Sequence, residues 1–419
     1  MVVLLCQADC KGTDGHDHGP HTADHHHHLH HGDDEPHPQH EGQHSNTLSK
    51  PNTDFAFALY KKLSAIPEFQ EKNIFFSPLS ISMALSMLAL GAKGETFSQL
   101  YEALGYAEMP TESVNEACQL IIDMLGVTQK YMQIDISNAL VVTERAQITD
   151  TFLEDTKKYH SSEAFSVDFS KPDEVVQEIN NYIAQKTNNK ITDMINEVDP
   201  KTLVILINCI YFWGEWFCQF YERLTEKDDF HVDDQNKVTV DMMLDVNYYD
   251  FYEDKENFVT VVRLPYEGSA DMIVVLPDQG KMKEVEGSIS QTLFRQWEQS
   301  LANSYLHLYM PKFSIVGTYS LEETLQEMGM VNVFSCSADL SGMTEEEVVL
   351  SQVKHKAILS VDEKGTEAAA STVGLMCGSS GCEPEEVIVK VNRPFLVFIT
   401  ESKTKSMLFM GKISNPTSQ

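Results

Sequence analysis

Histidines near the N-terminus are the side chains whose types and spacing most clearly suggest chemistry. Twelve of the sixteen histidines lie between residues 16 and 44. The densest group is His25, His26, His27, His28, His30 and His31. Neutral imidazole binds zinc, copper and nickel well, so this group could hold one of these metals and release it near pH 5 as the imidazoles become protonated. A solvated low-complexity tail without bound metal is the equally weighted alternative.

A second histidine pattern, His40-Glu41-Gly42-Gln43-His44, matches the zinc-protease motif. That motif requires a rigid helix that places both histidines on one face. Gly42 lies inside the pattern and prolines precede it, so we expect no catalytic zinc. The sequence also lacks the nucleophile-elbow serine, phosphate-binding lysine and dinucleotide-binding glycine motifs. We therefore expect a protein that is not an enzyme and requires no cofactor.

The composition divides the chain into three parts. Residues 1–8 resemble the end of a secretory signal whose apolar core is shorter than usual, so the sequence could start late. Residues 9–50 are rich in His, Asp, Gly and Pro and almost devoid of large apolar side chains. Such a segment cannot bury enough surface to offset the entropy of ordering, which predicts a disordered, acidic tail. Residues 51–419 then form one folded domain.

The segment from Glu363 to Thr372 has an unusual composition for the middle of a folded domain. A charged turn, Glu363-Lys364-Gly365, is followed by small residues with no apolar periodicity. Small side chains cost little entropy to order and little to bury, and Gly365 supplies a backbone pivot. The segment can therefore lie exposed or enter a sheet as a strand. On composition alone, a plain linker is the alternative.

Several motifs around this segment occur in a recognisable order. Two short apolar runs, Val391–Ile399 and Ser406–Ile413, follow it and indicate buried strands. Other motifs precede it: Asn73–Ser82, Met328–Ser335, Ala338–Thr344 and Val353–Ala357. Together they resemble the serpin family from about Asn52 to Gln419, and most closely its plasma α1-antitrypsin-like branch.

The resemblance implies an α+β fold with three β-sheets, eight to nine helices and an exposed reactive-centre loop. Residue patterns alone predict some of its elements. A helix should follow the cap Ser77-Pro78 and run to Leu90, and a second should span 173–186. Strands are expected at 204–212, 272–276 and 306–310. Ser320 and Glu323 form a capping-box pattern for a further helix.

The same resemblance assigns residues to three regions. The hinge of the loop comprises Glu363, Gly365, Thr366, Glu367, Ala368, Ala369 and Ala370. The shutter, a buried polar cluster beneath the central sheet where strands must part, comprises Ser77, Ser80, Asn208 and His355. The breach, at the top of that sheet, comprises Lys312 and Trp216, with Lys312 expected to pair with Glu363. Shutter residues that merely satisfy one another's hydrogen bonds are the structural alternative.

The implied mechanism is suicide-substrate inhibition of serine proteases. The protease would form an acyl-enzyme with the loop, and the cleaved loop would insert into the sheet and trap the enzyme covalently. A non-inhibitory ligand carrier or metal-binding protein on the same scaffold is the alternative. The hinge contains no proline, and strand alternation turns Glu367 outward, so its sequence favours inhibition.

The position of the cleaved bond is expected at Ser379–Ser380. Counting the family's usual distance from Glu363 reaches Ser379, whereas counting back from Pro394 reaches Glu383, which precedes a proline. The loop is thus about four residues longer than the family pattern. A small residue before the cleaved bond favours an elastase-like protease. Cys377 and Cys382 flank this bond, so we expect them not to be joined in the active inhibitor, unless oxidation switches it off.

Charge and apolar content limit the possible partners. The 419 residues carry a net charge of −32, which argues against nucleic acid and anionic membranes. The longest apolar runs, such as Thr202 to Trp213, are too short to span a bilayer. Residues 112–129, where some serpins carry a basic helix, contain no Lys or Arg, so we expect heparin to have little effect. We expect a secreted, extracellular monomer that binds extracellular serine proteases.

Overall fold

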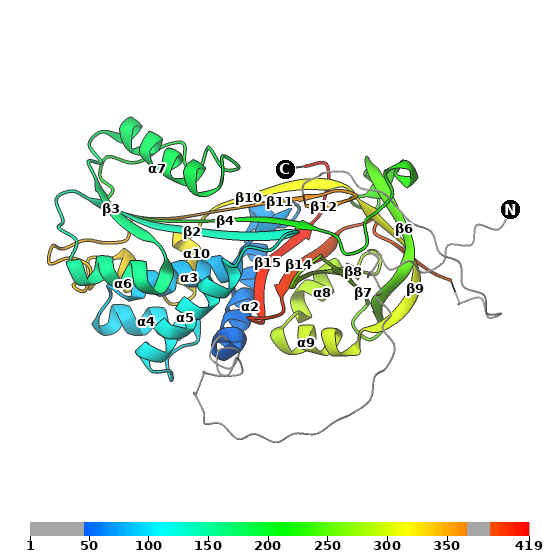
Figure 1. Cartoon of the computed structure of the whole chain (residues 1–419), viewed down its shortest axis with the longest axis horizontal. Helices are drawn as coiled ribbons and strands as arrows, with labels where there is room; N and C mark the ends of the chain where they lie inside the picture. The colour runs from blue at the N-terminus through cyan, green and yellow to red at the C-terminus, as the bar shows by residue number, and fades with distance from the viewer. Residues whose placement is uncertain (1–45, 367–385, 419) are drawn as a thin grey trace, which may run out of the picture.

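The computed structural model describes residues 46–366 and 386–418, which form helices packed around two hydrogen-bonded sheets (Figure 1). The described part contains nine α-helices, which agrees with the expected number. They are α2 (Ser49–Ala65), α3 (Pro78–Ala89), α4 (Gly94–Leu104), α5 (Thr111–Leu125), α6 (Asp150–His160), α7 (Pro172–Lys186), α8 (Met282–Ser288), α9 (Gln291–Ser300) and α10 (Glu322–Glu327). Among the described residues, no helix is both long and apolar enough to cross a membrane.

The smaller sheet is the central layer of the molecule. Its order is β10 (Phe313–Ser320), β11 (Gln352–Val361), β4 (Val204–Glu215), β2 (Met132–Thr143) and β3 (Glu163–Val167), and a two-residue strand, β12 (Gly365–Thr366), pairs with β4. Helix α3 lies against one face and α7 against the other (Figure 1). Along β4, Leu206 and Ile210 join the main core, whereas Ile207 and Cys209 join a second cluster beneath α7. The sheet is therefore buried on both faces beneath α7, whereas alternate residues of its edge strand β10 are exposed.

The larger sheet curves around the other side of the core. Its order is β1 (Ile74–Phe76), β15 (Ser406–Ile413), β14 (Phe395–Glu401), β8 (Ala270–Pro277), β7 (Val259–Pro265), β6 (Lys237–Asp254), β9 (Ala302–Pro311) and β13 (Val387–Lys390), with β5 (Glu226–His231) also on β6. The first part of β6 pairs with β5, most of the strand pairs with β9, and the last part pairs with β7. Because this strand is continuous, two of the three expected sheets are joined into one.

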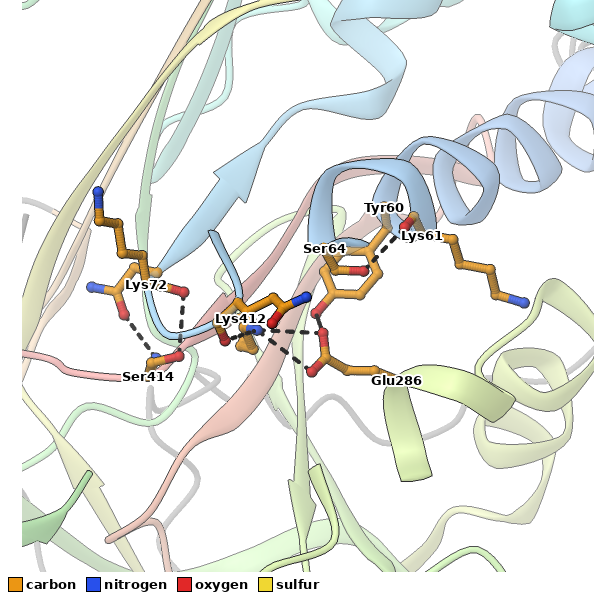
Figure 2. Close-up of polar contacts among 9 residues, drawn as sticks. Tyr60, Lys61, Ser64, Lys72, Glu286, Lys412 and Ser414 are labelled. Carbon is orange, nitrogen blue, oxygen red and sulfur yellow. Dashed lines mark hydrogen bonds and ion pairs between the residues drawn. The ribbon is translucent and has the colours of Figure 1, made fainter. Parts of the chain in front are cut away.

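A buried ion pair fixes β15 and, through it, the start of the site. Figure 2 shows Lys412 on β15 beside Glu286 on α8 and Tyr60 on α2. The Lys412 ammonium is 3.4 Å from Glu286 Oε2 and also donates to the Gln70 carbonyl at 3.0 Å, while the Tyr60 hydroxyl donates to Glu286 at 2.8 Å. β15 pairs with β1, which leads directly into Ser77. The pair thus holds the strand that positions the beginning of α3.

The elements predicted from periodicity are present. Helices α3 and α7 begin and end within one residue of the expected limits, and Ser77 caps α3 by accepting a hydrogen bond from the Ser80 amide. The three predicted strands lie within β4, β8 and β9. In β9, Leu306, Leu308 and Met310 are buried, as their alternation with His307 and Tyr309 predicts.

Two local expectations are wrong. The capping box at Ser320 and Glu323 does not form, because β10 continues through Ser320, which pairs with Lys354, and α10 begins at Glu322 without a side-chain cap. The boundary of the tail also shifts. Residues 46–48 form a 3₁₀ helix that leads into α2 at Ser49, and Leu48 is fully buried in the core. Residues 46–50, which we assigned to the tail, are therefore part of the described fold.

Candidate functional site: an insertion path between two parallel strands

Strands β4 and β11 are parallel neighbours that separate toward one end. Residues 352–357 of β11 pair with residues 205–210 of β4. Beyond Ile210, β4 continues to Glu215, and its neighbour at that end is β12 instead of β11. β12 runs antiparallel, with Gly365 opposite Glu215 and Thr366 opposite Gly214. A strand that extended β12 would therefore enter between β4 and β11 and run antiparallel to both.

A tight turn connects β11 to β12. The Asp362 amide donates to the Gly365 carbonyl at 2.9 Å, and the Asp362 carboxylate accepts from the amides of Lys364 and Gly365. Gly365 has φ +135°, and an added Cβ would lie 2.2 Å from the Gly214 carbonyl oxygen. Only glycine fits a backbone this close to its neighbour. The pivot expected from the sequence is thus a requirement of the turn.

The breach residues hold this turn against the sheet. Glu363, only 5% exposed, forms an ion pair with Lys312 at 3.0 Å and accepts a hydrogen bond from the Thr225 hydroxyl at 2.8 Å. Burial alone would raise the pKa of Glu363, but the hydrogen bonds from Lys312 and Thr225 lower that pKa below its ordinary value. The predicted Glu363–Lys312 pair is therefore present, and Thr225 is a partner that the sequence did not indicate.

Trp216 anchors the backbone of the same turn. Its indole N–H donates to the Asp362 carbonyl at 2.9 Å, and its amide donates to the Lys364 carbonyl at 2.7 Å. The indole ring stacks on Tyr266, with ring centroids 4.4 Å apart. Trp216 thus connects the hinge to the core of the larger sheet.

Reversal of the charge at Glu363 should loosen the top of the sheet. In Glu363→Lys, two ammonium groups would face each other at a nearly buried position, whereas Glu363→Gln keeps the shape and the hydrogen bond from Thr225. We expect Glu363→Lys to polymerise on mild heating and Glu363→Gln to do so less, as measured by native gels and light scattering. The exposed surface pair Lys50–Asp54 is a matched control, because such pairs contribute under about 1 kcal/mol. If the two Glu363 variants polymerise to the same extent, Glu363 is only a solvated charge in the turn and does not hold the sheet closed.

The four shutter residues meet where β4 and β11 are still paired. The Ser77 amide donates to His355 Nε2 at 3.0 Å, so Nδ1 carries the proton and donates to Asn208 Oδ1 at 2.6 Å. The Asn208 side-chain amide donates to both the carbonyl and the hydroxyl of Ser80. All four residues are at most 1% exposed. The structure therefore brings together the residues that the resemblance assigned to the shutter.

Strand register extends this cluster into a row across the sheet. His355 on β11 lies opposite Asn208 on β4, and Asn208 lies opposite Asn138 on β2. The Asn208 side-chain amide donates to the side-chain oxygen of Asn138. On the other side, Tyr319 on β10 lies opposite His355, and their rings stack. Burial lowers the pKa of His355 to about 3. Sequence reasoning missed Asn138 and Tyr319, because only the register of distant strands places them in the row.

A buried lysine ties β11 to the segment between α7 and β4. Lys356 lies opposite Cys209 in register. Its ammonium is 2.9 Å from the Asp193 carboxylate and donates to the Asp193 carbonyl at 3.1 Å. Only 8% of the Lys356 side chain is exposed. Insertion of a strand at the seam must therefore displace or stretch this contact.

Several predicted residues lie outside the part of the chain that the structure describes. They are the hinge residues Glu367, Ala368, Ala369 and Ala370, the bond Ser379–Ser380, Cys377 and Cys382, and the histidines 25–31. Within residues 46–366 and 386–418, no group of three or more His, Cys, Asp or Glu side chains is arranged to hold a metal ion. The metal hypothesis therefore rests on the tail alone.

Comparison with known proteins identifies the family. Residues 50–416 match the sequence profile of the family described as "Serpin (serine protease inhibitor)". The chain is a serpin. It is 47% identical over 373 residues to the alpha-1-antitrypsin homolog of Cyprinus carpio, covering 88% of this chain and 97% of that protein. It is 38% identical over 386 residues to Serpin A3-3 of Bos taurus, covering 90% and 92%.

Solved structures show that this serpin fold is shared with functionally different relatives. Human thyroxine-binding globulin in complex with thyroxine superposes with a TM-score of 0.84 at 36% identity, covering 90% of this chain and all of that one. Human kallistatin superposes with a TM-score of 0.82 at 34% identity, with the same coverage. The fold and the α1-antitrypsin-like branch expected from the sequence are therefore confirmed. A thyroxine-binding globulin among the similar structures means that the fold alone does not decide between inhibition and ligand binding.

Proposed function

We propose that this serpin is a secreted suicide-substrate inhibitor of extracellular serine proteases. One observation carries the proposal: β12 already pairs with the end of β4, in the direction that an inserting strand would need. Antiparallel pairing is slightly more stable per residue than parallel pairing. Insertion would replace one parallel interface between β4 and β11 with two antiparallel ones. The sheet thus gains stability from accepting the loop.

The contacts at the seam support a sheet that opens in steps. The Lys312–Glu363 pair closes the top, the Lys356–Asp193 pair covers the middle, and the row through His355 and Asn208 closes the seam below. Of these contacts, the one between His355 and Asn208 joins β11 and β4 directly, the Lys312–Glu363 pair holds the turn that leads into the path, and the Lys356–Asp193 pair joins β11 to the segment between α7 and β4. Each is also made of polar groups that can exchange partners, which a continuous apolar seam could not do.

Covalent trapping is the decisive measurement. Pancreatic elastase, chymotrypsin and trypsin would each be incubated with the protein, and the products separated on a denaturing gel. An inhibitor forms a band that combines the protease with the serpin up to its cleavage point, and a catalytically inactive protease does not. We expect elastase to be trapped most efficiently, because Ser379 is small. Cleavage of the loop by all three proteases without any stable complex would contradict the proposal.

Carriage of a small ligand is a second candidate function, and a cavity favours it. A cavity of about 220 Å³ lies among α9, β7, β8, β14 and β15. Its charged lining residues are Arg263, Asp271, Arg295, Glu298, Glu401 and Lys405, and Phe294 and Met407 contribute apolar surface. Arg263 and Arg295 are already paired with Asp250 and Glu298, which weakens the case for an anionic ligand. Calorimetric titration with thyroxine would show whether this function is shared with the globulin.

A further inference from the structure

Ser351 closes one end of the seam between β4 and β11, the end farthest from β12. It directly precedes β11, and its amide donates to the carbonyl of Val204, the first residue of β4, at 2.8 Å. Its hydroxyl accepts a hydrogen bond from the Leu203 amide at 3.0 Å. The Leu203 carbonyl in turn accepts from the Thr143 amide, at the end of β2, at 2.8 Å. Both hydrogen bonds of Ser351 cross the seam, so both must break if a strand is to enter as far as this end.

A polar pocket of about 160 Å³ lies beside Ser351, and we call it the seam-end pocket. It is lined by Asp199, Lys201, Thr202, Ser351 and Gln352. The side-chain oxygen of Gln352 is buried and accepts no hydrogen bond from any residue that the structure describes. A buried acceptor without a donor destabilises a folded protein, and most such acceptors are paired in native structures. Gln352 therefore penalises the closed sheet, and a backbone N–H that entered the pocket would relieve the penalty.

The register of β12 indicates which residues would enter the pocket. Thr366 lies opposite Gly214 in an antiparallel pairing, so each step forward along the loop lies one step back along β4. Residue 376, ten after Thr366, therefore comes opposite Val204, which is ten before Gly214. In the same register, residue 379 comes opposite Lys201 in the pocket. Ser379 is also the residue that sequence counting places before the cleaved bond.

The other position considered for the bond does not fit the pocket. Glu383, reached by counting back from Pro394, comes opposite Glu197 in this register, seven residues before β4 begins. A loop cleaved there would carry four residues, 380–383, past the pocket. The protease would then be held by slack chain instead of at the end of the sheet. The length of β4 therefore favours Ser379 over Glu383.

We propose that the seam-end pocket receives residues 376–379 of the cleaved loop, and that Ser351 and Gln352 set the balance between the closed and the inserted sheet. This inference rests on the proposed inhibitory function. Ser351 favours the closed sheet, because its hydrogen bonds exist only while this end of the seam is paired. Gln352 favours insertion, because the arriving backbone supplies the donor that its oxygen lacks. After insertion the Leu203 amide pairs with the loop instead of with Ser351.

Cross-linking tests the register directly. Residue 377 is a cysteine, and in the proposed register it lies opposite Leu203. Directly opposite residues of antiparallel strands lie about 4.5–5.5 Å apart at Cα, a distance that a disulfide spans. Leu203→Cys is reduced, cleaved beyond Cys377 with elastase or chymotrypsin, and then mildly oxidised. Peptide mass should show a disulfide between positions 203 and 377 in the cleaved protein and not in the intact protein. Thr202→Cys is the control, because neighbouring side chains of a strand point to opposite faces.

Melting temperatures test the roles of Ser351 and Gln352. Each variant is melted intact and after cleavage of the loop. We expect Ser351→Ala to lower the melting temperature of the intact form by about 2–4 °C and to leave the cleaved form unchanged. Ser351→Thr keeps the hydroxyl and should behave as the wild type. Gln352→Leu should raise the melting temperature of the intact form and not that of the cleaved form. The control Gln133→Leu changes an exposed residue at the other end of the sheet, opposite Trp213, and should shift both forms equally.

The results separate the pocket from the inhibitory function. A disulfide between positions 203 and 377, without any covalent complex of the wild type with a protease, would support the pocket and contradict inhibition. Trapping by the wild type, with no such disulfide in folded Leu203→Cys, would overturn the pocket and leave inhibition intact. Equal shifts of the intact and cleaved forms in Ser351→Ala would show that its hydrogen bonds survive cleavage, which overturns the proposal as well. If Leu203→Cys does not fold, the melting shifts of the Ser351 and Gln352 variants decide.

Discussion

Thr366→Arg should convert the inhibitor into a substrate. Thr366 lies opposite Gly214, and a Cβ at Gly214 would point at the Tyr266 ring within the core. Thr366 already pairs with β4, and when the residues after it insert, β11 must close against the other side of this strand, so an arginine here would become a charge within the sheet. An uncompensated buried charge costs about 3 kcal/mol or more, which slows insertion by more than a hundredfold relative to deacylation. The loop should still be cleaved, because the bond itself is unchanged.

The variant is mixed with protease at the ratio at which the wild-type serpin traps all of the protease. A denaturing gel should then show cleaved serpin and no covalent complex. Thr366→Ser is the matched control, since it keeps a small uncharged side chain and should trap normally. Melting temperatures of both uncleaved variants should be close to that of the wild type, because Thr366 sits at the entry of the sheet. If Thr366→Arg traps protease as well as the wild type does, trapping does not use insertion between β4 and β11.

A fall in pH from 7 to 5 should lower the free energy of unfolding by about 2 kcal/mol through His355 alone. Burial lowers the pKa of His355 from 6.5 to about 3, so within this range the unfolded chain binds a proton that the folded protein does not. The stability contributed by His355 is therefore complete above about pH 6.5 and is lost as the pH falls toward 3. Protonation would also place a second N–H against the Ser77 amide, which now donates to Nε2.

Other groups titrate in the same range, so a variant must isolate His355. Burial lowers the pKa of His160 to about 3, which adds to the effect, and burial raises the pKa of Asp245 to about 6, which opposes it. His355→Gln can still accept from Ser77 and donate to Asn208 without titrating. The difference between the urea midpoints at pH 7 and pH 5 should be smaller in this variant than in the wild type. The exposed His231→Gln should keep the wild-type difference. An unchanged pH dependence in His355→Gln would rule out His355 as its source.

The sequence predicted the site better than it predicted the boundaries of the fold. The pair Glu363–Lys312 and the cluster of Ser77, Ser80, Asn208 and His355 were accessible because each lies in a motif that resembles the serpin family. Asn138, Tyr319, Thr225 and Tyr266 were not, because their contacts depend on register or packing between segments distant in sequence. No local pattern around these residues distinguishes them from ordinary strand or loop residues.

The wrong expectations have local physical causes. The tail was assigned up to residue 50 from its polar composition, but Leu48 is buried in the core and residues 46–48 form a 3₁₀ helix that leads into α2. The capping box failed because pairing with β11 keeps Ser320 in a strand. In both cases tertiary packing overrode a pattern that was reasonable in isolation. The fold class itself is confirmed, and two of its three sheets are connected by hydrogen bonds because β6 is long enough to pair with both β9 and β7.

The two-residue pairing of β12 has a kinetic consequence. Starting a new strand inside a sheet ordinarily requires closing a loop before any pairing compensates for the lost chain entropy. Here the turn at Asp362 and the pairs Gly365–Glu215 and Thr366–Gly214 are in place before any protease arrives. In the mechanism we propose, insertion can therefore begin by extending existing pairs, one residue pair at a time, without a nucleation delay. In that mechanism, the outcome then depends on whether the seam below opens before the acyl-enzyme is hydrolysed, since strand pairing itself is fast, about 1–10 μs for a hairpin.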